Sequence, residues 1–313
     1  MEISNLTPSQ SAVLTRRVTL LSVAVAGTLV VLKAVVWIAS GSVALMASMA
    51  DSGLDLIASM STFFAVRYAA APPDAEHRFG HGKAEAFASL IQAGLVFASA
   101  ALVGQEAIRR IVEPRAVDKG VWAIGAMGVS TVLTACLIAA QTRMLRRAAS
   151  VAVSSDRAHY AADLASNIIA LVGIGAATLL QLNRLDAVAG LAIAAVLLWG
   201  AIAVFRQSSS QLMDHELSDE ARARIISIMK ADPRVKGVHQ LRTRAAGPTV
   251  HIQMHADLDP TLTFEAAHHV VVKAEKRVLD AFPAADVLIH ADPQGRAEPH
   301  GGEFAETSSP RVR

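Results

Sequence analysis

Hydrophobic residues form long, nearly charge-free runs up to about residue 213, and short apolar and polar segments alternate after that point. Crossing the hydrocarbon core of a bilayer takes about 20 helical residues. The first part of the chain therefore predicts six membrane-spanning helices after a short polar lead at residues 1–15. We expect these helices at about 16–39, 42–70, 84–110, 119–144, 152–182 and 185–210.

The chain after residue 213 has the pattern of a small soluble domain. Ser218, followed by two acidic residues, is typical of a helix start, because its hydroxyl can cap the helix and the acids favour the positive end of the helix dipole. That helix is expected to end near residue 231. Alternating apolar and polar residues then indicate strands on either side of a turn at Gly247 and Pro248. We expect strands at 235–244, 249–259 and 286–292 and a second helix at 263–282.

These patterns predict an all-α transmembrane domain followed by an α+β domain in the order α-β-β-α-β. We place the transmembrane domain at residues 16–213 and the soluble domain at 214–293. Residues 294–313 are rich in Gly, Pro, Ser and Glu, a composition typical of a disordered tail.

Composition supports a membrane protein and excludes several other classes. Hydrophobic residues make up 53% of the 313 residues and charged residues only 18%, which is too apolar for an ordinary soluble protein. The single cysteine, Cys136, excludes a disulfide framework and a thiolate metal cluster. The chain has no phosphate-binding glycine loop, no hydrolase or HExxH motif and no nucleic-acid-binding motif.

Basic residues gather mainly at one side of the predicted spans. The positive-inside rule then places both termini in the cytoplasm. The cytoplasmic set is Arg16, Arg17, Arg67, Arg78, Lys83, Arg143, Arg146, Arg147, Arg157 and Arg206, against Arg109, Arg110, Arg115, Lys119 and Arg184 on the other side.

Two of the predicted spans each carry a pair of possible metal ligands four positions apart. Asp51 and Asp55 lie in the second span, and His159 and Asp163 lie in the fifth. Residues i and i+4 share one face of a helix, so the two pairs could close a four-ligand cage. A charged side chain at mid-membrane costs about 2.5–3.5 kcal/mol on insertion scales and usually serves a function. Carboxylate and imidazole ligands suit a divalent transition metal such as zinc.

Two other interpretations of these residues remain open. Asp51 and Asp55 could pair with Lys33 in the first span, although one lysine cannot neutralise three carboxylates. Alternatively, the same residues could form a proton relay that binds no metal.

Two further groups have metal-ligand chemistry. The first, Asp74, His77 and His81, lies in the loop after the second span, where histidines of an ordinary polar loop are an equal alternative. The second lies in the soluble domain, where scattered surface histidines are the alternative. Its members are His239, His255, His268, His290 and Asp292.

Four stretches of the chain together resemble the cation diffusion facilitator family, and in particular its bacterial ferrous-iron and zinc efflux pumps. The resemblance runs from about Val18 to Pro293. It rests on Gly41-Ser-Val-Ala-Leu with Ala50-Asp-Ser-Gly-Leu-Asp55, on His77-Arg-Phe-Gly-His-Gly-Lys-Ala-Glu85, on His159-Tyr-Ala-Ala-Asp163, and on Gly237-Val-His-Gln-Leu-Arg-Thr-Arg244 with Ile289-His-Ala-Asp-Pro293.

The resemblance implies a homodimer with a ferredoxin-like cytoplasmic domain on each protomer. It also implies a salt bridge that locks the protomers together near the membrane, matching Lys83 and Asp214. One departure concerns Ala291, whose side chain cannot bind metal where similar pumps carry a polar residue. The implied metal sites match Asp51, Asp55, His159 and Asp163 for transport, Asp74, His77 and His81 in the loop, and His239, His255, His268, His290 and Asp292 at the interface between the two cytoplasmic domains.

The expected function is efflux of a divalent metal across the bacterial inner membrane in exchange for protons, since metal and protons compete for the same ligands. The cytoplasmic domain would regulate transport by binding metal. Absence of sulfur ligands disfavours Cu(I), and the histidine disfavours Mg2+ and Ca2+. The remaining candidates are Zn2+, Fe2+, Cd2+, Co2+ and Mn2+. A metal sensor that binds without transport and an intramembrane metalloenzyme are the rival classes, and we expect no enzymatic activity.

Overall fold

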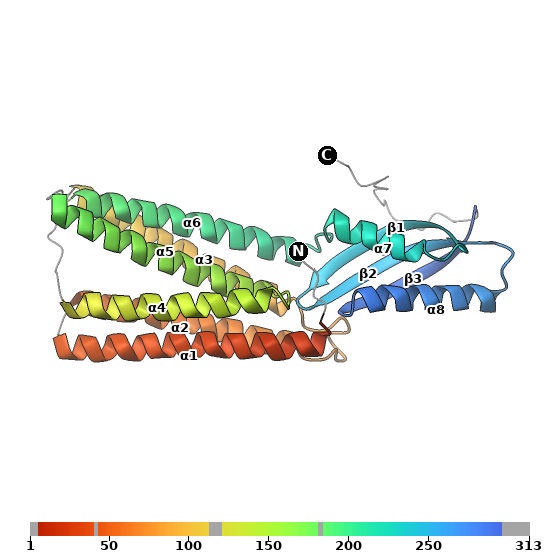
Figure 1. The fold of residues 1–313 in the computed structure, drawn as a ribbon, viewed down its shortest axis with the longest axis horizontal. Coiled ribbons are helices and arrows are strands. Elements are labelled where there is room, and N and C mark those ends of the chain that lie inside the picture. Colours follow the sequence, from red (N-terminus) through yellow and green to blue (C-terminus); the bar gives the residue numbers. More distant parts are fainter. Residues whose placement is uncertain (1–5, 41–42, 113–120, 181–183, 296–313) are drawn as a thin grey trace. The chain divides into compact units, whose positions relative to one another are not determined.

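The computed structural model describes residues 6–40, 43–112, 121–180 and 184–295 (Figure 1). The chain divides into two compact units. The first contains residues Ala12–Arg146 and Ser150–Ser209, and the second contains the chain from Ser210 onward together with two short segments. The tail that we expect to be disordered lies outside the described residues from 296 onward.

Long helices that run side by side build the first unit (Figure 1). Helix α1 begins at Pro8 rather than near residue 16. The reason is a local cap, in which Thr7 and Gln10 exchange hydrogen bonds between backbone and side chain, and Pro8 at the first helical position lacks the N–H that would be unpaired there. The described helices are α1 (Pro8–Ser40), α2 (Val43–Ala69), α3 (Ala84–Val112), α4 (Val121–Leu145), α5 (Val151–Leu180) and α6 (Arg184–Leu212).

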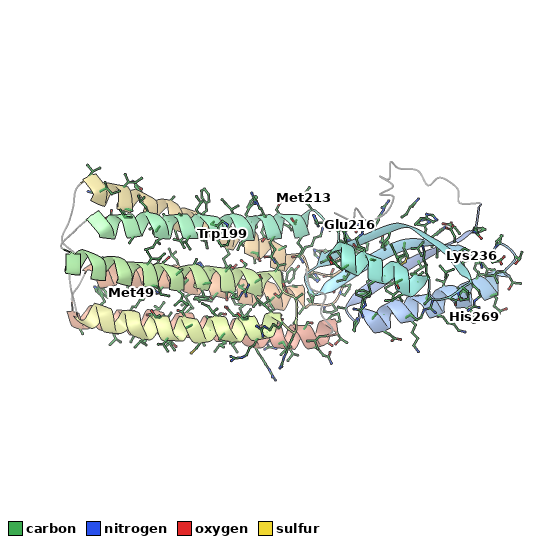
Figure 2. All side chains as sticks on the ribbon, turned by 45° about the horizontal axis from the view of Figure 1, so that its top comes forward. Met49, Trp199, Met213, Glu216, Lys236 and His269 are labelled. Atoms are coloured by element: carbon green, nitrogen blue, oxygen red, sulfur yellow. The ribbon has the colours of Figure 1, made fainter. Side chains whose placement is uncertain are left out.

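Four stretches among the described residues are long and apolar enough to cross a membrane. They lie at Pro8–Ala39, Ala84–Arg109, Gly128–Leu145 and Val188–Leu212, on α1, α3, α4 and α6. Helices α2 and α5 carry the candidate metal ligands Asp51, Asp55, His159 and Asp163 and are not among these four stretches. That they span the membrane stays a prediction. Large apolar side chains remain exposed on these helices, among them Trp199 on α6 at 75% (Figure 2). Apolar surface of this kind is suited to contact with lipid.

The second unit has the predicted α-β-β-α-β order. A three-stranded sheet in the order β1-β2-β3 pairs β1 and β2 antiparallel and β2 and β3 parallel. Apolar residues from the strands and both helices form one core, with Ile225, Ile252 and Val270 fully buried. The elements are α7 (Asp219–Met229), β1 (Val235–Ala246), β2 (Thr249–Leu258), α8 (Phe264–Ala281) and β3 (Ala285–Pro293).

Strand register sets which side chains share the sheet face opposite this core. Val250, Ile252 and Met254 of β2 belong to the core, so the residues between them face the other way. His255 on that face is paired with His239 of β1 and His290 of β3. The register thus brings residues from three strands into one row.

The loop before β1 contains an ion pair with a consequence for acid stability. Arg234 donates from Nε to Oδ1 of Asp232 at 3.0 Å and from Nη2 to Oδ2 at 2.8 Å. These hydrogen bonds lower the pKa of Asp232 to about 2. A carboxyl group with a lowered pKa in the folded state stabilises the fold above its unfolded pKa of about 3.9, and this contribution disappears as the pH falls toward 2.

We therefore expect Asp232→Asn to be less stable than wild type at pH 6 and equally stable near pH 2. The measurement is the urea concentration at which the cytoplasmic domain of the full-length protein is half unfolded. Hydrogen exchange of peptides from α8 reports this unfolding. Arg234→Ala should reduce the pH dependence in the same way. If the wild type and Asp232→Asn differ by the same amount at both pH values, the pair does not contribute.

Candidate metal centres

The first centre lies between helices α2 and α5. Asp55 of α2 and His159 and Asp163 of α5 place their ligand atoms within 4.8 Å of one another. Nε2 of His159 lies 3.0 Å from Oδ1 of Asp55 and 3.4 Å from Oδ2 of Asp163. Two carboxylates and one imidazole nitrogen thus converge on one point, and this donor set suits a divalent transition metal. We call these three residues the membrane triad.

A second polar contact holds the two helices in this register. Ser59 lies one turn after Asp55 on α2, and Tyr160 follows His159 on α5. Their hydroxyl oxygens are 2.8 Å apart, and both residues are buried. Because residues i and i+4 share a helix face, this bond aligns Asp55 with the histidine.

Asp51, the fourth residue of the predicted quartet, lies outside the membrane triad. Its side chain is exposed, one helical turn before Asp55. Lys33 of α1, which the alternative interpretation pairs with these aspartates, donates from Nζ to the Ser52 hydroxyl at 2.6 Å. The role of Asp51 in metal binding stays a prediction.

The second centre lies in the loop between α2 and α3, where the structure brings together Asp74, His77 and His81. One carboxylate oxygen of Asp74 lies 3.2 Å from Nδ1 of His77, and the other lies 3.2 Å from Nε2 of His81. Gly80, at a φ of 78°, adopts the left-handed conformation that turns the chain back between the two histidines. Backbone N–H groups, that of His77 foremost, lower the pKa of Asp74 and favour its charged, metal-binding form.

The third centre lies on the open face of the sheet and combines His239, His255 and Asp292. Oδ2 of Asp292 lies 2.7 Å from Nδ1 of His255 and 3.4 Å from Nε2 of His239. Its other oxygen, Oδ1, lies 3.2 Å from Nε2 of His290. The two oxygens of this carboxylate therefore face different imidazoles, an arrangement in which one aspartate can bridge two cations.

One predicted member of this centre is absent from it, and one residue that sequence reasoning missed is present. His268 is exposed on α8, with its ring 6.2 Å from that of its neighbour His269, and does not join the group (Figure 2 labels His269). Asp257 does approach it, with Oδ1 3.5 Å from Nε2 of His239. Gly237, which is paired with Asp257 across the two strands, leaves space for this carboxylate, because a side chain at residue 237 would collide with it. The alternation of apolar and polar residues in β2 puts Asp257 on the same face as His255, and this pattern could have identified Asp257 as a candidate ligand.

The predicted salt-bridge residues Lys83 and Asp214 belong to different units. Within its own unit Asp214 accepts a hydrogen bond from Nη1 of Arg244 at 3.1 Å. The proposed pairing of Lys83 with Asp214 between protomers stays a prediction.

Two buried carboxylates in the helical unit were also missed by sequence reasoning. Glu85, in the first turn of α3, accepts hydrogen bonds from the Ser150 hydroxyl at 2.6 Å and from the backbone N–H of Ala152 at 3.5 Å. It therefore caps the beginning of α5. Asp156 of α5 accepts a hydrogen bond from Nε2 of Gln141 at 2.8 Å and is fully buried. Asp156 lies three residues before the candidate ligand His159 within an expected membrane span, and this position could have identified it as a residue of interest.

Family models match both units of the chain. The model described as the cation efflux transmembrane domain matches residues 19–213, and the model described as the cytoplasmic domain of cation efflux proteins matches residues 217–294.

Similar proteins include curated cation-efflux pumps and a solved domain. The cation-efflux pump FieF of Serratia proteamaculans is 37% identical over 285 residues, covering 91% of this chain and 94% of the relative. FieF of Shewanella oneidensis is 39% identical over 274 residues, covering 87% of this chain and 92% of the relative. The metal-bound C-terminal domain of the CzcD transporter from Thermotoga maritima is 29% identical, with a TM-score of 0.25, and the match covers 25% of this chain and 93% of that one.

Proposed function

Because the chain belongs to the cation efflux family of transporters, we propose that it exports a divalent transition metal, Zn2+ or Fe2+, across the bacterial inner membrane in exchange for protons. Cd2+, Co2+ and Mn2+ are further cargo candidates. Both termini lie in the cytoplasm in this proposal, and six spans form the transport domain at residues 16–213. No enzymatic activity is part of it.

The observation that supports this proposal is the membrane triad. Asp55, His159 and Asp163 converge from two helices, and each offers a ligand atom within 4.8 Å of the others. Asp51 is proposed as the fourth ligand, since it lies one turn from Asp55 on the same helix. Oxygen and nitrogen ligands without sulfur favour zinc or ferrous iron over Cu(I).

Proton exchange follows from the chemistry of the same ligands. An aspartate or histidine binds metal only when it has lost its proton, so metal binding releases protons and protonation releases metal. Metal taken from the cytoplasm would therefore be displaced by protons that enter from the far side.

The test is zinc uptake by proteoliposomes that contain the full-length protein, with a pH-sensitive dye inside. Proteoliposomes in which the cytoplasmic face of the protein points outward should accumulate zinc and lose protons from the lumen at the same time. Parallel uptake of Fe2+, Cd2+, Co2+ and Mn2+ ranks the cargo. Zinc binding without uptake would instead favour a membrane sensor, and uptake without proton counterflow would contradict the antiport mechanism.

For the cytoplasmic domain, at residues 214–293, we propose a regulatory role in a homodimer. His268 is exposed and separate from the cluster of its own chain, so it is free to complete the metal centre of a second copy. Metal at His239, His255, His290 and Asp292 would then draw the two domains together. The loop centre at Asp74, His77 and His81 is proposed as a further cation site near the membrane, and Lys83 is proposed to pair with Asp214 between protomers.

A further inference from the structure

The buried carboxylate of Asp156 is not part of the membrane triad, yet three other helices reach toward it. Oδ2 accepts a hydrogen bond from Nε2 of Gln141 on α4 at 2.8 Å. Oδ1 accepts hydrogen bonds from Nε2 of Gln92 on α3 and from the hydroxyl of Ser59 on α2, both at 3.4 Å. All three donors are neutral. Asp156, Gln92, Gln141 and Ser59 are nearly or fully buried.

Such an arrangement is expensive in a membrane domain. A carboxylate loses its hydration when it is buried, and neutral donors offset only part of that cost. Replacing a buried polar group and its hydrogen-bond partners by apolar side chains of the same shape can be nearly neutral or even stabilising. Ionisable residues inside a membrane domain therefore usually serve a function.

Gln92 connects Asp156 to the surroundings of the ligand His159. Its Oε1 accepts a hydrogen bond from the Ser155 hydroxyl at 2.8 Å, while its Nε2 donates to Asp156. Gln92, Ser155 and His159 all line one small cavity of about 10 Å³, between α3, α5 and α6. That volume is near the lower limit for a single water molecule.

His159 has an unsatisfied atom that a water in this cavity could serve. Nε2 of His159 lies against Asp55 and Asp163, where a metal would bind. Nδ1 is buried and has no hydrogen-bond partner among the residues that the structure describes. When Nε2 binds metal, the proton of the neutral ring is on Nδ1, and metal-binding histidines almost always donate this proton to a carboxylate, a carbonyl or a water.

We propose that Gln92 and Ser155, held in place by Asp156, bind one water molecule that accepts the Nδ1–H of His159. This contact sets the tautomer and the ring orientation, so that the lone pair of Nε2 points at the metal. Asp156 and Gln92 are thus positioning residues of the membrane triad. The inference rests on the proposed transport function, because Asp156 and Gln92 are assigned a role only through the membrane triad, the proposed transport site.

The test compares zinc uptake by full-length Gln92→Leu and Ser155→Ala with the wild type. Loss of such outer contacts typically costs about 10- to 100-fold in metal affinity. We expect the KM for zinc to rise by about 10-fold or more in Gln92→Leu, with the maximal rate nearly unchanged, because the variant weakens binding and leaves the ligands in place. Ser155→Ala should raise KM by a smaller factor, and its small volume change makes misfolding a lesser concern.

Two controls separate a positioning role from a merely structural one. Gln105→Leu makes the same substitution at an exposed site on α3 and should leave KM unchanged. Asp156→Asn keeps an acceptor oxygen for Gln92 and should retain more affinity than Asp156→Leu. A wild-type KM in both Gln92→Leu and Ser155→Ala would overturn the proposal, as would a lower maximal rate at unchanged KM.

Zinc binding in detergent distinguishes this inference from the transport proposal. In a background of His81→Ala and His255→Ala, which disables the other two centres, Gln92→Leu should bind zinc more weakly in competition with a chromophoric chelator. If the wild type binds zinc and does not transport it, the transport proposal fails and the weaker binding still supports the positioning role. Equal binding by this variant and its background overturns the positioning role alone.

Discussion

Replacing Asp55 by alanine is expected to abolish zinc uptake in proteoliposomes, a loss of at least about 100-fold in the rate at low zinc. Asp55 is the only contribution of α2 to the membrane triad among the described residues, and its Oδ1 lies 3.0 Å from Nε2 of His159. Without it the two ligands on α5 lose the one ligand of the membrane triad that lies across the helix interface, and the proposed fourth ligand, Asp51, lies one turn away. Because metal sites depend strongly on ligand number and geometry, the site without Asp55 should bind zinc too weakly for transport.

The fold should survive this substitution, because Ser59 and Tyr160 still join α2 to α5. Met60→Ala, a change at an exposed position on the same helix, is the matched control and should transport at the wild-type rate. Asp51→Ala then tests the fourth ligand, and a loss as large as that of Asp55→Ala would support the quartet. Wild-type zinc accumulation by Asp55→Ala would show that the membrane triad is not the transport site.

The second large effect is expected in the cytoplasmic domain. Removing both His255 and His290 should eliminate the dependence of transport on metal bound outside the membrane. His255 and His290 face opposite oxygens of Asp292, so the double variant removes an imidazole from each side of the carboxylate. The rate should then rise with zinc only as the transport site fills, whereas in the wild type we expect an additional stimulation when metal binds the cytoplasmic domain. The measurement is uptake rate against zinc concentration on the cytoplasmic side.

His269→Ala is the matched control, because it removes an exposed imidazole of α8 that belongs to none of the centres. It should preserve the stimulation. His268→Ala should lose it, since that residue is proposed to complete the centre of the second protomer. Identical zinc dependence in the wild type and the double variant would contradict regulation through this centre.

The order of elements could be predicted from the sequence because it depends on neighbours along the chain. Hydrophobic runs located the helices, with the start of α1 as the main difference, and alternation located the strands. The proximity of candidate ligands within one helix or one loop could also be predicted from their spacing in the sequence. His159 and Asp163 share a face at i and i+4, and Asp74, His77 and His81 lie within one short loop, so their proximity needed no knowledge of packing.

Contacts between distant segments were decided by tertiary structure alone. Strand pairing placed Asp257 beside His239 and gave the two oxygens of Asp292 different imidazole partners. Alternation within one strand shows which residues share a face and does not show which residue of another strand lies opposite. Helix packing joined Gln92 of α3 and Gln141 of α4 to Asp156, which in the sequence stands between Ser155 and Arg157 with no sign of these distant partners. Periodicity therefore determined which residues share a face, and the packing of those faces decided which residues meet.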